Sequence, residues 1–195
     1  EGKYHYVNSD EPLNKHDHII FNLDDGKQLR YNDTRKFGRM KLVSLDNYAN
    51  ELPLSKLGPE PFYADEKKLY EKLHKCNLPI KHALLDQSII AGIGNIYANE
   101  ICFAMRLDPY TPANKLTKKS VTELIEVASN ILNEAIRQGG TTIHSFSANG
   151  IDGLFQVKLK VHMQKKCSVC GGEITKEAIK GRGTYYCKEC QKRRR

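Results

Sequence analysis

Four of the six cysteines are spaced as metal ligands. Cys167 and Cys170 form one Cys-x2-Cys pair, Cys187 and Cys190 form a second, and sixteen residues separate the pairs. Each pair can present two thiolates to one tetrahedral ion, and this spacing is typical of a four-cysteine zinc site. Two disulfides are the alternative. Because the chain shows no secretion signal and two further cysteines remain, the pattern favours one structural zinc ion.

Two positions beside glycine offer groups that bind phosphate. Arg182 stands between Gly181 and Gly183, in the segment between the cysteine pairs, so we expect it to project from the tip of a hairpin. A guanidinium there suits a phosphate, whereas a solvated arginine in a glycine turn is the alternative. The Gly94-Asn95 step opens a predicted helix whose free amides can bind an anion. Glycine turns between helices also serve packing alone.

Basic residues gather at the C-terminal end of the chain. Residues 158–195 hold twelve Lys and Arg against three Glu, a net charge of +9. The whole chain carries +8, so the remainder carries −1. Clustered cations favour a polyanionic partner, because each phosphate that they neutralise releases a counterion. A solvated tail is the alternative, since charged blocks can serve solubility alone.

The periodicity of apolar residues predicts the elements that position these groups. Alternation around the turn Asp24-Asp25-Gly26 predicts a β-hairpin over residues 18–31. Apolar residues at helical spacing predict four helices, the third capped by Asn95 and the fourth opened by Ser120 and Glu123 in capping-box spacing. The helices are expected at residues 65–75, 81–91, 95–106 and 120–137, and further strands at residues 39–43 and 155–162.

The composition is that of a globular protein. Hydrophobic residues make up 39% and charged residues 28% of the 195 residues, without a low-complexity tract, which excludes collagen-like and disordered classes. No apolar run approaches the roughly 18 residues that span a bilayer, and the first residues lack the apolar stretch of a signal peptide. We therefore expect a soluble intracellular protein with no membrane partner.

Four longer motifs surround these groups: Tyr-Asn-Asp-Thr-Arg-Lys-Phe-Gly at 31–38, Leu-Leu-Asp-Gln at 84–87, Ala-Gly-Ile-Gly-Asn-Ile-Tyr-Ala-Asn-Glu at 91–100, and Gly-Arg-Gly-Thr-Tyr-Tyr-Cys at 181–187. Together they resemble those of a known family, the bacterial formamidopyrimidine-DNA glycosylases. The resemblance covers nearly the whole chain and implies an α+β fold. Residues 1–55 would be the C-terminal remnant of a β-sandwich catalytic domain, residues 56–150 a helix-two-turn-helix DNA-binding domain, and residues 151–195 a zinc-ribbon hairpin with a basic tail.

The resemblance implies DNA-binding roles for seven residues. Arg35 matches the arginine that hydrogen-bonds the base left without a partner, and Phe37 matches the aromatic wedge beside it, as base flipping requires. A surface charge and a core aromatic are the alternatives for these two. Lys81 matches a lysine near the damaged strand. The residues around a gripped backbone phosphate would be Gly94, Asn95, Tyr97 and Arg182. Residues 141–153 correspond to a lesion-recognition loop, in which His144 replaces the arginine expected in many relatives.

The resemblance also implies an activity. The family excises oxidised purines, such as 8-oxoguanine and formamidopyrimidines, from double-stranded DNA and then cleaves the abasic site as an AP lyase. Its nucleophile is the amine of an N-terminal proline, whereas this chain begins Glu1-Gly2 and the nitrogen of its first proline, Pro12, is acylated. We therefore expect a monomeric, zinc-containing, DNA-binding chain of the bacterial cytoplasm that is inactive alone. A non-catalytic zinc-ribbon nucleic-acid-binding module is the alternative.

Overall fold

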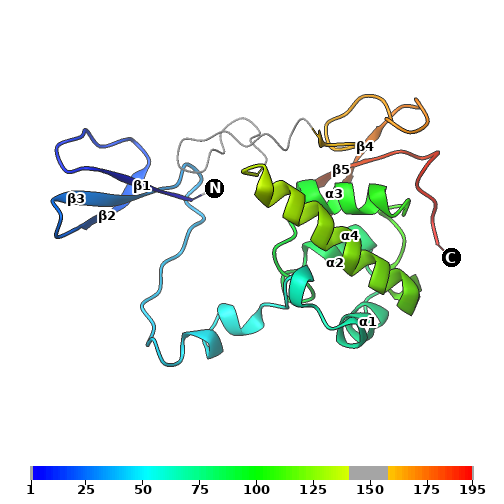
Figure 1. Cartoon of the computed structure of the whole chain (residues 1–195), viewed down its shortest axis with the longest axis horizontal. Coiled ribbons are helices and arrows are strands. Elements are labelled where there is room, and N and C mark those ends of the chain that lie inside the picture. Colours follow the sequence, from blue (N-terminus) through cyan, green and yellow to red (C-terminus); the bar gives the residue numbers. More distant parts are fainter. Residues whose placement is uncertain (1, 141–157, 195) are drawn as a thin grey trace.

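The computed structural model describes residues 2–140 and 158–194. It has an N-terminal sheet and a larger helical part that carries a C-terminal hairpin, and an extended connector joins the two (Figure 1). The lesion-loop residues 141–153, with His144, lie outside the described residues. No helix among the described residues is both long and apolar enough to cross a membrane. The predicted α+β class is confirmed.

The N-terminal part is a three-stranded antiparallel sheet with the order β1-β3-β2. Its strands are β1 (Lys3–Asn8), β2 (Asp17–Asn22) and β3 (Lys27–Asn32). The β2–β3 hairpin confirms the prediction, and Gly26 takes the positive φ of +77° that its turn demands. The prediction lacked β1, although Tyr4 and Tyr6 alternate there with polar residues.

The strand predicted at residues 39–43 is wrong. These residues form no strand, and Leu42 is 99% exposed. A strand needs a neighbour for its backbone groups, and both edges of β3 are already taken by β1 and β2. The chain instead runs through a connector with three short 3-10 turns: η1 (Tyr48–Asn50), η2 (Leu54–Lys56) and η3 (Pro61–Tyr63).

Four helices and one 3-10 turn enclose the main core. The helices are α1 (Glu66–His74), α2 (Ile80–Leu85), α3 (Asn95–Ala104) and α4 (Lys118–Arg137), with η4 (Ala113–Lys115) before α4. The apolar stripe of α4 packs against the other helices, as its periodicity predicts. Fully buried members of this core include Leu73, Ile80, Leu84, Ile101 and Leu124.

Three helices differ from the prediction at their ends. The predicted helix over 81–91 ends at Leu85, because the Asp86 carboxylate accepts the N–H of Ser88 at 2.9 Å and turns the chain away. Gly94 rather than Asn95 is the N-cap of α3, which ends at Ala104. At α4 the cap is Thr117, whose Oγ1 accepts the N–H of Ser120 at 3.2 Å, so the predicted capping box is wrong.

The C-terminal part is a hairpin of β4 (Thr175–Ile179) and β5 (Arg182–Tyr186). Lys180 and Gly181 at its turn both have positive φ, +46° and +76°, which suits the twist of a two-residue hairpin loop. The strand predicted over 155–162 is wrong for residues 158–162, which form none, and residues 155–157 lie outside the described part.

Candidate zinc centre and nucleic-acid interface

The four predicted metal ligands meet at one point of the fold. The sulfur atoms of Cys167, Cys170, Cys187 and Cys190 all lie within 4.8 Å of one another. The Cys167–Cys190 and Cys170–Cys187 sulfur pairs are 3.7 and 3.5 Å apart. Zinc–sulfur bonds of about 2.3 Å in a tetrahedron place sulfurs about 3.8 Å apart, so the geometry fits one zinc ion. Among the described residues no other cluster of potential ligands occurs.

Backbone N–H groups donate to two of the four sulfurs. Val169 donates to Sγ of Cys167 at 3.5 Å, and Gly172 donates to Sγ of Cys170 at 3.4 Å. Burial alone would raise the pKa of Cys167, but the N–H groups of Cys170 and Val169 lower the pKa to about 7. A thiol with such a pKa loses its proton readily, as zinc binding requires.

The hairpin docks on the helical part through a buried lysine. Lys81 in α2 is 0% exposed, and its Nζ donates to the carbonyl oxygen of Gly183 and to Oγ1 of Thr184, both at 2.8 Å. Nδ2 of Asn95, in the first turn of α3, donates to the same Gly183 oxygen at 3.1 Å. Two helices therefore hold the backbone of β5 directly beside Arg182.

Burial makes the Lys81 ammonium group easier to deprotonate. Loss of hydration lowers the pKa of its ammonium from 10.5 to about 8, and the nearby positive charge of Arg182 acts in the same direction. Arg182 itself is exposed, as is Gly94 at the open start of α3. A cation and a free helix N-terminus thus lie on the two elements that meet at Gly183, an arrangement suited to a phosphate.

A second buried layer joins α3 to the hairpin. Nδ2 of Asn99 donates to Nδ1 of His162 at 2.6 Å, and Oδ1 of Asn99 accepts the N–H of Tyr185 at 3.4 Å. The His162 ring lies edge-on to Tyr185 with 4.7 Å between centroids. Burial lowers the pKa of His162 to about 4, so the imidazole is neutral and Nδ1 can accept the bond.

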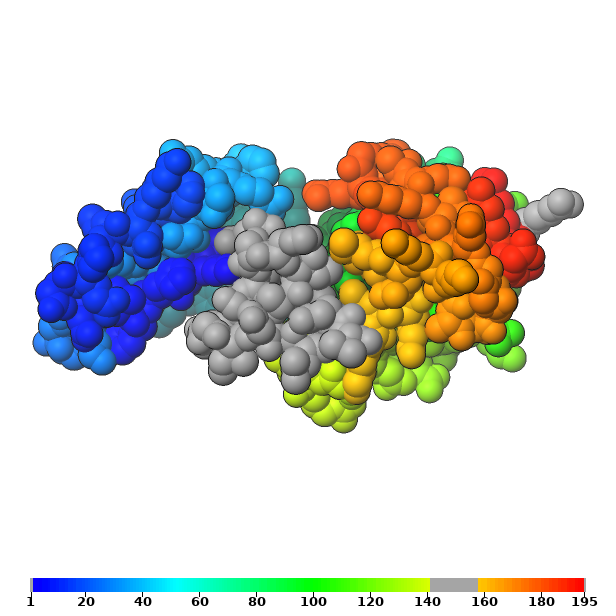
Figure 2. All heavy atoms as spheres, turned by 90° about the horizontal axis from the view of Figure 1, so that it is seen from above, coloured from blue at the N-terminus to red at the C-terminus, as the bar shows by residue number. Residues whose placement is uncertain are grey.

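The Glu100 carboxylate takes the place of a neighbouring strand as the hydrogen-bond acceptor for residues 160–162. These residues lead into the zinc module, the segment that holds the four cysteines and the β4–β5 hairpin. Its buried carboxylate accepts the backbone N–H groups of Lys160, Val161 and His162 at 2.8, 3.1 and 2.8 Å. These bonds explain why residues 158–162 show strand-like alternation, with Leu159 and Val161 buried, without pairing in a sheet. Glu100 thus anchors the zinc module to α3, and the hairpin forms a continuous surface with the helical part (Figure 2).

Glu100→Gln is expected to lower the free energy of unfolding by about 1–3 kcal/mol. The amide keeps one acceptor oxygen but turns an NH2 group toward N–H donors that the carboxylate had satisfied, leaving a buried donor unpaired. Urea unfolding followed by circular dichroism measures the loss. Glu126→Gln, on the exposed side of α4, is the matched control and should change stability little. Equal stability of the two variants would contradict this role.

Arg35 and Phe37 lie together just beyond the end of β3. They follow β3 in a tight loop, and the Arg35 guanidinium lies over the Phe37 ring at 5.4 Å from its centroid. Phe37 is 77% exposed, so the alternative that it is a core aromatic is wrong. The exposed ring of Phe37, with the Arg35 guanidinium beside it, is open to a contact outside the chain.

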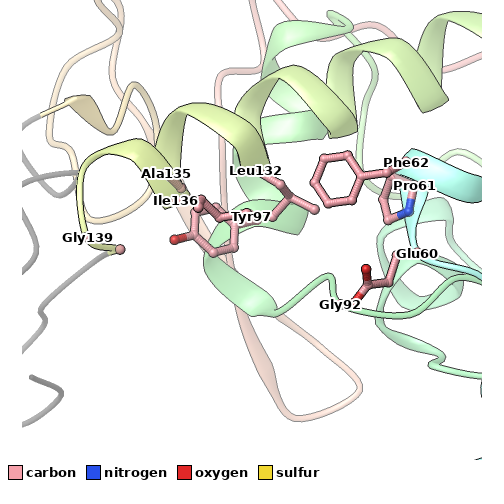
Figure 3. Close-up of a pocket in the computed structure, with 10 residues that line it drawn as sticks. Glu60, Pro61, Phe62, Gly92, Tyr97, Leu132, Ala135, Ile136 and Gly139 are labelled. Carbon is pink, nitrogen blue, oxygen red and sulfur yellow. The ribbon is translucent and has the colours of Figure 1, made fainter. Parts of the chain in front are cut away.

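Tyr97 of α3 lines a separate hollow of about 390 Å³ (Figure 3). Its walls include Pro61 and Phe62 of η3 with Leu132 and Ile136 of α4, and none of the described residues of the zinc hairpin takes part. The recess is mostly apolar, with Glu60 at its edge. Tyr97 therefore faces a different surface from Arg182, although both carry the same predicted role.

The sequence predicts Lys81, Asn95 and Arg182 but not the residues that hold them in place. Asn99 and Glu100 stand within the quoted 91–100 motif, and Asn99 follows Asn95 by four residues, a spacing that places both on one helix face. That spacing was the available signal. Thr184 stands within the 181–187 motif, but nothing local shows its bond to Lys81 or that of His162 to Asn99, because these partners lie 103 and 63 residues away in the chain.

Comparison with known proteins places the chain among repair enzymes. Residues 1–40 match the formamidopyrimidine-DNA glycosylase N-terminal domain, residues 57–147 its H2TH domain, and residues 164–193 the zinc finger found in FPG and IleRS. Together with the cysteine geometry, the zinc-finger match establishes one structural zinc ion.

Full-length relatives agree with these matches. The chain is 46% identical to the formamidopyrimidine-DNA glycosylase of Bacillus licheniformis, over 99% of this chain and 72% of that protein, and 44% identical to that of Bacillus subtilis, over 98% and 71%. A Lactococcus lactis FPG mutant in complex with Fapy-dG containing DNA has a TM-score of 0.91 at 40% identity, over 99% of this chain and 72% of that chain. The chain therefore belongs to the formamidopyrimidine-DNA glycosylase family.

Proposed function

We propose that this chain recognises damaged bases in double-stranded DNA for base-excision repair and that it works in the bacterial cytoplasm, where the genome lies. The proposal rests on two groups suited to a DNA phosphate, the start of α3 and Arg182, which meet beside Gly183. There Asn95 holds the start of α3 against β5, which presents Arg182. Solved relatives bind abasic-site DNA and, for MutM, 8-oxo-G containing DNA, which supports an oxidised purine as the lesion.

We assign the phosphate grip to Arg182, Asn95 and the exposed start of α3 at Gly94. Arg182 supplies the charge, and the helix N-terminus supplies N–H donors and the positive end of its dipole. Lys81 is fully buried, so it cannot touch a phosphate in this arrangement. Its part in the grip is to hold the Gly183–Thr184 backbone that carries Arg182. Tyr97 lines a different hollow, so its proposed DNA contact would lie outside this grip.

We assign recognition of the damaged site to Arg35 and Phe37. When a nucleotide turns out of the duplex, an aromatic ring can fill the gap in the stack, and an arginine can hydrogen-bond the base left opposite. Phe37 is exposed enough to enter a duplex, and Arg35 lies beside its ring. A zinc-ribbon module that merely binds nucleic acid has no use for such a wedge, which favours repair over the alternative.

The family is enzymatic, and we propose that residues 1–195 alone bind damaged DNA without excising the base. An excision of this kind needs an amine at the sugar C1′, and no residue of this chain matches the family's proline nucleophile. Full-length relatives extend beyond the region matched here, since the chain covers 72% of the Bacillus licheniformis protein.

One pair of assays tests this function. Fluorescence anisotropy with a labelled duplex should show preferred binding to a tetrahydrofuran abasic site over the undamaged duplex, and borohydride should trap no adduct with an 8-oxoguanine duplex. Equal affinity for both duplexes would refute damage recognition and support the zinc-ribbon module. A trapped adduct would instead show that this chain has its own nucleophilic amine.

A further inference from the structure

We propose that Asp33 is a positioning residue that holds the loop carrying Arg35 and Phe37, so that recognition of a damaged site depends on its carboxylate. The inference rests on the proposed function, in which this loop enters the duplex. Asp33 is 2% exposed and cannot itself contact DNA. Asp33 stands within the 31–38 motif, in which only Arg35 and Phe37 were given roles, and its partners are backbone groups.

The Asp33 carboxylate forms the centre of the loop. One oxygen, Oδ1, accepts the N–H of Arg35 at 3.1 Å, and the other, Oδ2, accepts the N–H of Gly38 at 2.8 Å. The Asp33 carbonyl oxygen accepts the N–H of Lys36 at 3.3 Å. Three N–H groups of residues 35–38 therefore end on this one residue, and the loop closes around it as an extended Asx turn.

Asp33 is in turn fixed to the sheet. Its N–H donates to the carbonyl oxygen of His16 at 3.0 Å, and its carbonyl oxygen lies 3.0 Å from Nε2 of His18. His16 directly precedes β2, and His18 lies within β2. Asp33 therefore links β2, through its backbone, to the exposed loop that follows β3, through its carboxylate, which is the geometry that a wedge needs to act against a base stack.

Gly38 closes the loop because only glycine fits there. A Cβ built on Gly38 would lie 1.7 Å from the hydroxyl oxygen of Tyr31, so no larger residue can bring its N–H to the Asp33 carboxylate without moving that ring. The Tyr31 hydroxyl also lies 3.4 Å from Oδ2 of Asp33. Sequence and packing thus agree in directing the Gly38 amide at Asp33.

Burial of apolar side chains does not hold this loop. Phe37 is 77% exposed, and the residues from Thr34 to Met40 are all exposed, so the loop has no apolar anchor of its own. The N–H of Gly38 lowers the pKa of Asp33, and the N–H of Arg35 acts in the same direction. At neutral pH the carboxylate is therefore ionised, and both of its oxygens can accept. An asparagine has one acceptor oxygen, and its NH2 group would face the remaining N–H.

Amide hydrogen exchange of the free 195-residue chain tests whether Asp33 holds the loop. In Asp33→Asn the amides of Arg35 and Gly38 are expected to exchange at least about tenfold faster, while amides of β3 keep their protection. Asp33→Ala, which removes both acceptors, should give the same loop effect. Asp24→Asn, in the exposed β2–β3 turn, is the matched control. Unchanged exchange at Gly38 in both Asp33 variants would overturn the proposal.

A mutant cycle tests whether the held loop matters for DNA. The readout is the ratio of the dissociation constants for an undamaged and a tetrahydrofuran-containing duplex. Asp33→Asn and Phe37→Ala are each expected to reduce this ratio about five- to tenfold. The dissociation constant for the undamaged duplex should stay within about twofold of the wild-type value. Because Asp33 acts through Arg35 and Phe37, adding Asp33→Asn to a variant that already carries Arg35→Ala and Phe37→Ala should cost nothing further.

The outcomes separate this proposal from the proposed function. Additive losses, or a retained ratio in Asp33→Asn, would show that Asp33 has no positioning role in recognition. A wild-type ratio of one would refute damage recognition itself, while the exchange measurement would still decide whether Asp33 orders the loop. A general loss of β3 protection in Asp33→Asn, absent from Asp24→Asn, would show a role in folding instead and overturn the proposal.

Discussion

Removal of the zinc ion is expected to unfold the segment from Lys165 to Lys192 and to weaken DNA binding at least about tenfold. Structural zinc sites contribute about 10–16 kcal/mol of binding energy that is also folding energy. The apolar cluster under the hairpin has four buried members, and two of them, Cys167 and Cys187, are ligands. Without the metal this cluster has too little apolar surface to order the hairpin.

The helical part should survive this loss. Its core cluster, which includes Leu73 and Leu124, contains no residue of the C-terminal module. A strong chelator should therefore leave most of the helical circular dichroism, including that of α4, while zinc content falls to zero. Arg182, carried by β5, moves away from the start of α3 when the hairpin unfolds, which explains the weaker DNA binding.

Arg182→Ala is the control that keeps the metal. It should lower the affinity for DNA while zinc content and circular dichroism stay at the wild-type level. The slope of log affinity against log salt should fall by about 0.9, the value of one phosphate contact, whereas zinc removal should reduce it further. Unchanged DNA affinity after complete removal of zinc would refute the link from metal to hairpin to DNA.

Lys81→Met is expected to abolish a gain in stability that the wild type shows at alkaline pH. The pKa of Lys81 is about 8 in the fold and about 10.5 when the side chain is hydrated. Below pH 8 both states hold the proton, and the fold bears the full cost of the buried charge. Between pH 8 and 10.5 only the unfolded chain keeps it, so stability rises with pH, by on the order of 3 kcal/mol. A methionine side chain has no such proton, so the variant should show no such rise.

Urea unfolding of both proteins between about pH 7.5 and 10 measures this difference. The wild type should gain stability relative to Lys81→Met as the pH rises, and Lys119→Met, at an exposed position of α4, should follow the wild type. DNA binding of Lys81→Met should weaken although Lys81 is buried, because Gly183 and Thr184 lose a donor that places Arg182. A difference in stability that does not change with pH would contradict the buried ammonium.

Features set by nearby residues were predictable from the sequence. The turn at Gly26 is built into its own hairpin, and the apolar stripe of α4 repeats over twenty residues. The two Cys-x2-Cys pairs each form one local unit, so their spacing alone indicated zinc. The long motifs also identified the family, which the matches over 99% of the chain show.

Elements whose backbone bonds end far away in the chain were not predictable. Residues 158–162 have the alternation of a strand, but their N–H groups end on Glu100, about sixty residues earlier. The helix at 81–91 stops at Leu85, where the following residues bond to the connector: the carbonyl oxygen of Gln87 accepts the N–H of Gly58 at 2.7 Å. The periodicity of apolar residues shows which side of an element is apolar. It does not show which other element packs against that side.

The same distinction applies to the candidate site. The sequence by itself determined which residues could bind zinc and phosphate, since their chemistry and local spacing are visible there. Only the tertiary structure decided that Lys81 is buried beneath Gly183, 102 residues away, and that Phe37 is exposed in a loop closed around Asp33. Burial and hydrogen-bond partners depend on how distant elements pack, and packing is a property of the whole fold rather than of any one segment.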